Sequence, residues 1–205
     1  MVAGSGITHS ERFEGPLRRP GARIEGIQAW IGLPERDEET APGFVHVSAS
    51  DIPTFTDRGL SASIVAGSAF GAREPFATFS PLFYVHAVLD AGASCPLPAG
   101  YPERAAYVVS GSIEVDGRSF SKGQMLVFGP QGAPTIKALT PATLMLLGGE
   151  PIGPRHMWWN FVSSSKERIE QAKADWKAGR FKLPDGDSDE FIPLPEEPKP
   201  PQPMS

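Results

Sequence analysis

His9 and Glu11 are the two side chains whose types and spacing most directly suggest chemistry. In an extended segment, residues i and i+2 project to the same side of the backbone, so one imidazole and one carboxylate can point at a common metal ion. Two donors are too few, because a non-haem iron site of the facial type takes two histidines and one carboxylate. Taken alone, the pair is better explained as a solvated histidine and glutamate on an N-terminal segment.

The other three histidines, His46, His86 and His156, are far apart, with no second histidine within four residues of any of them. His86 falls on the more polar face of the alternating segment 83–89, so we expect it at a rim and not at a metal. His156 precedes an aromatic run that we interpret as packing. Cys95 has no neighbouring histidine or cation to lower the pKa of its thiol, so a catalytic cysteine is not expected.

The sequence lacks the motifs of several large enzyme classes. No glycine-rich stretch fits a P-loop or a dinucleotide-binding turn, and no Gly-x-Ser-x-Gly nucleophile elbow occurs. The adjacent carboxylates Glu38 and Glu39 fall in a polar connector, where a run of charged residues is usually a solvated surface. We therefore interpret this carboxylate pair as solvated charge.

Composition and charge argue against nucleic-acid-binding, secreted and membrane proteins. The 205 residues carry 19 Lys and Arg against 24 Asp and Glu, a net charge of −5, whereas a protein that tracks nucleic-acid phosphates is normally basic. We therefore expect no direct nucleic-acid binding. The N-terminus lacks the features of a secretory signal, and no apolar run approaches the roughly 18 residues of a membrane span. A single cysteine cannot form an internal disulfide, which fits a reducing compartment. Together, these three features predict a cytoplasmic protein that does not bind membranes.

The elements that must position such residues are predicted to be short strands. Gly and Pro number 22 each, and their spread between brief runs of β-branched and aromatic residues is typical of an antiparallel sandwich or barrel. A hairpin is predicted over 107–120, with turns at Ser110-Gly111 and Asp116-Gly117. The predicted strands are 26–34, 44–47, 60–66, 81–89, 105–109, 112–115, 124–128 and 142–147.

One helix and a tail are predicted late in the chain. Ser164 and Glu167 have the spacing of a capping box, and Gly179 supplies the glycine that commonly ends a helix. Residues 184–205 contain seven of the 22 prolines, so this tail is predicted to be disordered. Its apolar patch, 191–194, either returns to the domain or stays free. The helix face predicted to dock on the sheet consists of Ile169, Ala172 and Trp176.

Several separate segments together resemble the pirin family of two-barrel cupins. They are 1–11, 26–34, 78–84, the hairpin around Gly111, 146–152 and the end of the helix at 178–181. The resemblance covers residues 1 to about 183. It implies an all-β fold, a cupin-type antiparallel jelly roll with one C-terminal helix and a disordered tail.

The resemblance also implies a domain organisation. Met1 aligns inside the family pattern, as though most of the N-terminal cupin barrel were lacking. The implied parts are 1–34 as remnant strands of that barrel, 35–43 as a connector, 44–183 as the C-terminal cupin domain and 184–205 as the tail.

A metal site follows from the resemblance as well. Pirins hold one iron in the first barrel through two histidines of an earlier His-x-His strand and through a His and a Glu that match His9 and Glu11, with Glu11 also available as a base. The stretch that supplies the other two ligands is absent, and the second barrel does not replace them. Its ligand positions, read back and forward from the hairpin glycine, fall on non-ligating residues: Arg104, Pro98, Gly100 and Thr135. We therefore expect a metal-free second barrel with an empty mouth.

The function that the resemblance implies is Fe(II)-dependent oxygenation of the quercetin 2,3-dioxygenase type, with a flavonoid-like small molecule as substrate. Because half of the ligand set is missing, we expect this polypeptide alone to hold iron weakly or not at all and to be inactive. The alternative is a non-catalytic module that binds a protein partner in transcriptional or metabolic regulation. Residues 1–34 would then carry partner binding or self-association, because strands built for a missing barrel expose apolar side chains such as Ile27 and Trp30.

Overall fold

The computed structural model of the chain describes residues 1–12, 15, 19–21, 23, 25–74, 76–132 and 134–196. The chain divides into two compact units, one formed by Met1–Val45 with Ile152–Ser205 and the other by His46–Pro151. The segment 44–183, predicted as one domain, contributes to both units, and its assignment as a single domain stays a prediction.

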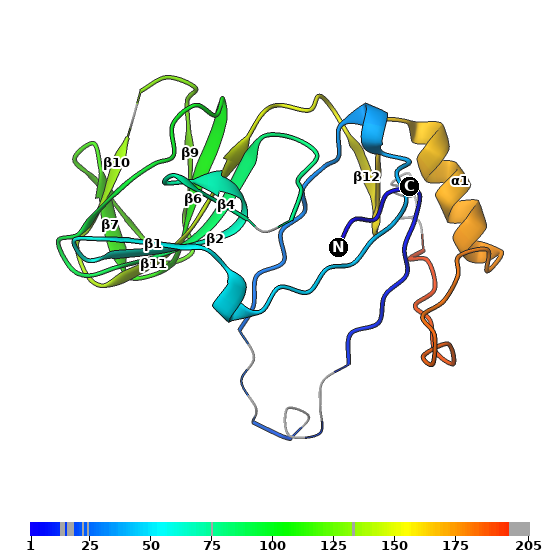
Figure 1. Cartoon of the computed structure of the whole chain (residues 1–205). Helices are drawn as coiled ribbons and strands as arrows, with labels where there is room; N and C mark the ends of the chain where they lie inside the picture. Colours follow the sequence, from blue (N-terminus) through cyan, green and yellow to red (C-terminus); the bar gives the residue numbers. More distant parts are fainter. Residues whose placement is uncertain are drawn as a thin grey trace, which may run out of the picture. The chain divides into compact units, whose positions relative to one another are not determined.

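Two antiparallel sheets form the His46–Pro151 unit (Figure 1). The larger sheet contains β1 (Thr54–Asp57), β2 (Leu60–Ala69), β3 (Ala72–Arg73), β4 (Leu82–Leu89), β6 (Glu103–Ser110), β9 (Met125–Phe128) and β11 (Ala142–Gly149). The smaller contains β5 (Ser94–Pro96), β7 (Ser112–Val115), β8 (Arg118–Ser121) and β10 (Thr135–Ala138). The strand orders are β1-β2-β4-β11-β6-β9, with β3 beside β2, and β5-β10-β7-β8. A short 3-10 helix, η3 (Ala49–Asp51), precedes β1.

Alternation of side chains along the strands gives this unit a single core. In β4, Phe83, Val85 and Ala87 are buried, while Tyr84 and His86 are half-buried, because successive strand residues face opposite sides of a sheet. Buried residues from both sheets meet in one apolar cluster. Its largest members include Phe83, Ile64, Leu89, Ile113, Ile136, Leu144 and Leu146. This packing of two sheets confirms the predicted antiparallel jelly roll.

Most strand predictions are confirmed, and two are wrong. The predicted strands at 60–66, 81–89, 105–109, 112–115, 124–128 and 142–147 correspond to β2, β4, β6, β7, β9 and β11. The segments 26–34 and 44–47 form no strand. Phe44 and Val45 are 71% and 63% exposed, and residues of high β-propensity form a strand only where a neighbouring strand pairs with them.

The predicted hairpin over 107–120 is confirmed in its second half. β7 and β8 pair across the turn at Asp116-Gly117. The Ser110-Gly111 turn instead carries the chain from the larger sheet to the smaller, because β6 pairs with β9 and β11 while β7 pairs with β8 and β10. A turn between strands of different sheets has the same glycine signature as a hairpin turn, so the sequence does not distinguish them.

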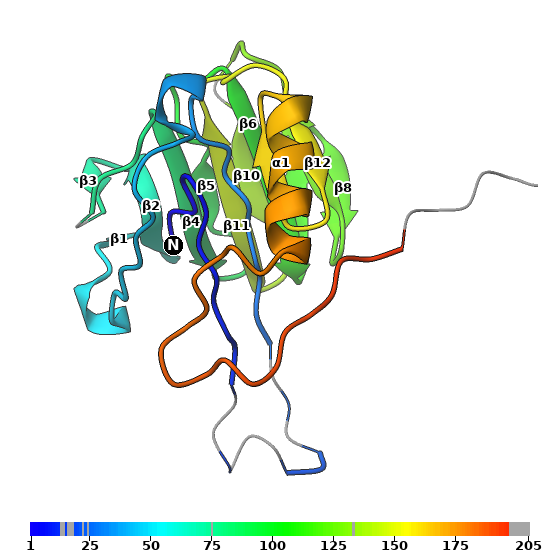
Figure 2. The same ribbon diagram turned by 90° about the vertical axis from the view of Figure 1, so that its right-hand side faces the viewer.

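The unit formed by Met1–Val45 and Ile152–Ser205 is built on a helix and a two-stranded sheet. The helix α1 (Lys166–Lys177) contacts β12 (His156–Trp158) and β13 (Phe161–Ser163) (Figure 2). Ile169 and Ala172 are buried on the helix and Trp176 is half-buried, which confirms the predicted packing face. The 3-10 helix η2 (Glu35–Asp37) lies in the connector. Stacked or edge-on aromatic rings join the elements: Trp158, Trp159, Phe161, Trp176 and Phe181.

The helix ends differ from the prediction by one residue at the start. Ser165, not Ser164, is the N-cap, and its hydroxyl accepts a hydrogen bond from the Arg168 amide at 3.1 Å. The same hydroxyl donates to the Glu167 carboxylate at 2.9 Å. At the other end, Gly179 has a φ of +64°, a left-handed conformation that glycine adopts without steric cost, as predicted.

The described tail, 184–196, contains no helix or strand. The indole Nε1 of Trp176 donates to the carbonyl oxygen of Ile192 at 2.9 Å, so the apolar patch 191–194 returns to α1. Of the predicted tail, 197–205 lies outside the described residues, as do 13, 14, 16–18, 22 and 24 of the predicted remnant strands. In the described part of the chain, no helix has the length and apolar character needed to cross a membrane.

Candidate functional site

The segment that carries His9 and Glu11 is held by the residues that follow α1. The Thr8 hydroxyl donates to the Lys182 carbonyl. At Gly6, whose φ is +137°, an added Cβ atom would lie 2.6 Å from the Phe181 ring. Because only glycine permits so close an approach of backbone to ring, this residue fixes the path of the chain toward His9.

Arg12 fixes the other end of this segment. Its guanidinium pairs with Asp187 at 2.6 Å and with Glu190 at 3.0 Å. The hydrogen bond from Arg12, assisted by one from Ser10, lowers the pKa of the Asp187 carboxyl to about 2, and the two acidic partners raise the pKa of Arg12. The acidic tail thus neutralises the cation next to Glu11.

The site residues predicted from the sequence are exposed and are not joined by further ligands. His9 and Glu11 are both exposed. In the part of the chain that the structure describes, no three His, Cys, Asp or Glu side chains come together in a way that could hold a metal ion. Since tight binding of iron in a facial site takes at least three protein donors, these residues by themselves do not fit an iron centre.

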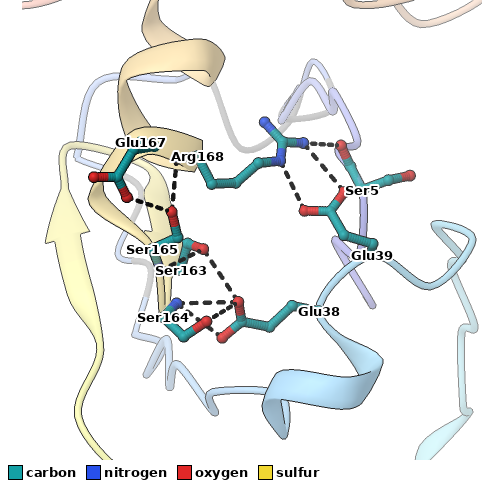
Figure 3. A network of polar contacts seen from close by, with 8 residues as sticks. All are labelled: Ser5, Glu38, Glu39, Ser163, Ser164, Ser165, Glu167 and Arg168. Carbon is teal, nitrogen blue, oxygen red and sulfur yellow. Dashed lines mark hydrogen bonds and ion pairs between the residues drawn. The ribbon is translucent and has the colours of Figure 1, made fainter.

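Glu38 organises the best-defined polar cluster of this unit (Figure 3). Its carboxylate accepts hydrogen bonds from the Ser164 amide at 3.0 Å, the Ser164 hydroxyl at 2.9 Å and the Ser163 hydroxyl at 3.1 Å. An ion pair with Arg155 Nε, at 2.6 Å, joins two side chains that are only 13% and 12% exposed. The interpretation of Glu38 as solvated charge is therefore wrong.

The electrostatic state of Glu38 follows from two opposing effects. Burial works to raise the pKa of its carboxyl. The hydrogen bonds from Ser164 and Ser163 and the charge of Arg155 outweigh burial, and the pKa of Glu38 lies below its ordinary value. Glu38 is therefore ionised at neutral pH, and the cluster works as a charged clamp.

The neighbouring Glu39 extends the contact to the N-terminal segment (Figure 3). Arg168 Nε donates to Glu39 at 2.7 Å, and Arg168 Nη2 donates to the Ser5 carbonyl at 2.8 Å. The connector, α1 and the segment before His9 are thus tied together. Sequence reasoning missed this arrangement because Glu38 and Ser164 are 126 positions apart, and the capping-box spacing of Ser164 points to Glu167 and not to Glu38.

Arg104, in the His46–Pro151 unit, stands at the position that the family resemblance assigns to a metal-binding glutamate. Arg104 is 3% exposed, and its guanidinium donates to the carbonyl oxygens of Gly129 at 2.7 Å, Gln131 at 3.2 Å and Gly132 at 3.1 Å. A guanidinium has only donors, so it holds this loop and cannot bind a cation. The other predicted positions, Pro98, Gly100 and Thr135, offer no carboxylate or imidazole.

The other three histidines and the single cysteine differ in burial. His46 is exposed, and His86 and His156 are half-buried, with none of them in a metal-holding group among the described residues. Cys95 is fully buried, and desolvation raises the pKa of its thiol to about 12. Because the thiolate is the nucleophilic form, this cysteine is chemically inert at neutral pH.

Comparisons with known proteins give the family. A family model described as the pirin C-terminal cupin domain matches residues 84–182. A candidate quercetin 2,3-dioxygenase of Pseudomonas aeruginosa is 31% identical over 182 residues, which are 87% of this chain and 56% of that protein. A crystal structure of quercetin 2,3-dioxygenase from Acinetobacter baumannii has a TM-score of 0.73 at 23% identity, covering 84% of this chain and 59% of that one. This likeness shows a shared cupin fold.

A pirin-like protein of Caulobacter vibrioides is more similar in sequence. It is 59% identical over 197 residues, which are 96% of this chain and 68% of that protein. The chain thus spans between 56% and 68% of the length of these two curated relatives. On the strength of this identity and coverage, the chain belongs to the pirin family.

Proposed function

We propose that this chain carries half of the iron site of a quercetin 2,3-dioxygenase-like pirin, with His9 and Glu11 as two of the metal ligands and Glu11 as a base toward a flavonoid-like substrate. The similar proteins of Pseudomonas aeruginosa and Acinetobacter baumannii are both named as quercetin 2,3-dioxygenases, which supports an oxygenase reaction. The observation that carries the proposal is the pair itself, two exposed donors at i and i+2 with no third donor beside them in the described residues.

The same observation limits what the polypeptide does alone. Metal affinity depends on the complete set of ligands, and each missing donor weakens it. The 205-residue chain therefore holds iron weakly, and it does not turn over quercetin.

Metal content and turnover of the purified chain test this proposal. The chain is loaded with Fe(II) without oxygen, dialysed, and measured for bound iron and for quercetin consumption in air. We expect far less than one equivalent of iron, no turnover, and the same result for His9→Ala and Glu11→Gln. One retained equivalent that disappears in both variants would contradict the proposed weak binding and would show a complete site.

The intact mass of the protein from its native cells separates the remaining cases. A mass well above 22.0 kDa together with bound iron would assign the oxygenase activity to that longer protein, on which it should be tested. A mass of 22.0 kDa without iron would favour a metal-free function.

Exposed apolar residues near residue 30 favour a second candidate function, a protein-binding module. Ile27, Trp30 and Ile31 are 50%, 48% and 53% exposed, and they lie in a segment without helix or strand. Large apolar side chains that gather at a surface commonly mark an interaction site. The acidic net charge favours a protein partner or a second copy of the chain over nucleic acid.

Light scattering coupled to size-exclusion chromatography tests this surface. We expect a mass that rises with concentration to at least twice 22.0 kDa, and a return toward the monomer in Trp30→Ser. The matched control is Phe191→Ser, which removes a 66% exposed aromatic side chain elsewhere and should leave association unchanged. A monodisperse monomer of the unchanged chain at all concentrations would contradict self-association.

A further inference from the structure

An open cavity lies at the surface of the His46–Pro151 unit, between the β2–β3 hairpin and the segment that leads into β6. Its volume is about 600 Å³, within the range of roughly 300–1,000 Å³ that is typical of small-molecule sites. Residues 68–73, 96–99 and 101 supply its lining. His9 and Glu11 do not, so this site is separate from the proposed oxygenase function.

The cavity has an apolar wall with an aromatic ring. Leu97, which is 2% exposed, lines it together with Pro98 and Phe70. The Phe70 ring stacks on Phe55 with 5.2 Å between ring centroids, which holds it in place. A flat apolar body, such as an aromatic ring, is the shape that prolyl and phenyl faces contact best.

Phe70 occupies a backbone position that its side chain disfavours. It has a φ of +52°, and Gly71 after it has a φ of +77°, between the paired residues Ala69 and Ala72. Two-residue turns with positive φ at both positions strongly prefer Asn, Asp or Gly. A bulky residue in this conformation is strained, and such strain is concentrated at functional sites. The phenyl ring packs on Phe55 and against the apolar core of the unit, and the same ring lines the cavity.

Two hydroxyl groups and one cation give the cavity its polar character. The Tyr101 hydroxyl donates to the Ser68 carbonyl at 2.8 Å and lies 3.0 Å from the Ser68 hydroxyl. With its own hydrogen committed to the carbonyl, the Tyr101 oxygen accepts from Ser68, and the Ser68 oxygen keeps the capacity to accept from a ligand hydroxyl. Arg73 also lines the cavity, and no carboxylate in the described part of the chain pairs with it.

We propose that this cavity binds a small hydroxylated aromatic carboxylate. Its ring contacts Phe70 and Pro98, its carboxylate binds Arg73, and its hydroxyl donates to Ser68. An arginine recognises a carboxylate through two parallel charge-assisted hydrogen bonds, which a neutral ligand cannot form.

Titration of the ¹⁵N-labelled full chain with 4-hydroxybenzoate, followed by NMR, tests the proposal. We expect saturable shifts concentrated in the backbone amides of residues 68–73, 97, 99 and 101, since Pro96 and Pro98 carry no amide hydrogen. The neutral analogue 4-hydroxybenzamide should bind at least about tenfold more weakly, since a hydrogen bond to a charged group contributes at least that much. Absence of saturable binding by 10 mM 4-hydroxybenzoate (on the order of the weakest specific affinities), or shifts confined to other residues, would overturn the proposal.

Two variants identify the groups that recognise the ligand. Arg73→Gln should weaken 4-hydroxybenzoate at least about tenfold and leave the affinity for 4-hydroxybenzamide unchanged, whereas Lys122→Gln removes an exposed cation away from the cavity and should change neither. Phe70→Asn should abolish binding. Asparagine suits the turn, but the change also removes the packing of the ring on Phe55 and on the core, so the amide spectrum of the free variant is recorded first to show that it is folded. Equal affinities in Arg73→Gln and Lys122→Gln would overturn the role of Arg73, and unchanged binding by Phe70→Asn would overturn the role of the ring.

Discussion

Replacing Glu38 by alanine is expected to lower the free energy of unfolding of its unit by about 2–4 kcal/mol. This is somewhat below the ~3–5 kcal/mol cost of removing one partner of a fully buried ion pair, because Arg155 keeps hydrogen bonds to the carbonyl oxygens of Leu33, Ile152 and Pro154. The change leaves the Arg155 guanidinium, whose side chain is 12% exposed, without its carboxylate. It also removes the acceptor of the Ser164 amide and of two serine hydroxyls. A donor left unsatisfied and shielded from water keeps its full desolvation cost.

Tryptophan fluorescence during urea unfolding measures this loss of stability in the unit that contains Glu38. All four tryptophans, at 30, 158, 159 and 176, belong to the Met1–Val45 and Ile152–Ser205 unit. The matched control is Glu39→Ala, which removes a neighbouring carboxylate that is 59% exposed and pairs with Arg168, and it should cost no more than about 1 kcal/mol. Equal urea midpoints for Glu38→Ala and Glu39→Ala would contradict the stabilising role that we assign to the hydrogen bonds and ion pair of Glu38.

The pH dependence of this effect has a definite sign. The pKa of Glu38 is lowered in the folded chain, so its ionised form contributes stability that is fully present above the ordinary pKa of a glutamate, about 4.3. That contribution is lost as the pH falls through the lowered folded value. The difference in unfolding free energy between the unchanged chain and Glu38→Gln should therefore shrink on acidification below that ordinary pKa. A difference that stays constant down to pH 2 would show that the charge of Glu38 is not what stabilises the unit.

The jelly roll could be predicted from the sequence because its signal is local. In β4, apolar residues alternate with Tyr84 and His86 over 83–87, and this pattern assigns Phe83 to the core and His86 to the opposite face. The segment 26–34 has a similar composition, yet it forms no strand. Propensity states which residues fit a sheet, whereas pairing depends on a neighbouring strand that local sequence does not reveal.

The candidate site could be predicted only in part for the same reason. His9 and Glu11 share a short motif, so their types and spacing were visible in the sequence. The role of Glu38 depends on Ser164 and Arg155, more than 110 positions away, and a pair of acidic residues in a polar connector gives no sign of such partners. The loop-binding role of Arg104 was likewise hidden, because backbone carbonyls such as that of Gly129 accept hydrogen bonds whatever the side chain is.

A Gly67→Ala chain should be destabilised by about 4 kcal/mol or more, or fail to fold, because two separate obstacles meet at this residue. Its φ of +74° lies in the left-handed region, where a side chain costs about 1–2 kcal/mol. An added Cβ atom would also lie 1.8 Å from the carbonyl oxygen of Leu82 on the paired strand β4. Backbone cannot move aside as a flexible side chain can, so the pairing of β2 with β4 must open, and losses above about 4 kcal/mol are the signature of such an exceptional clash.

Gly117→Ala separates the clash from the conformational cost. Gly117 has nearly the same φ, +75°, and an added Cβ atom there meets no atom within 4 Å. Its substitution should therefore cost only about 1 kcal/mol. Hydrogen exchange of the β2 and β4 amides, measured at increasing urea concentration, reports the opening of this pair of strands. If these amides are equally protected from exchange in both variants, the loss of stability in Gly67→Ala is only conformational, and the close approach of the two backbones contributes nothing. If only Gly67→Ala loses protection, that close approach is what requires glycine beside the bulge between Ile64 and Ala66, and the register of the larger sheet depends on it.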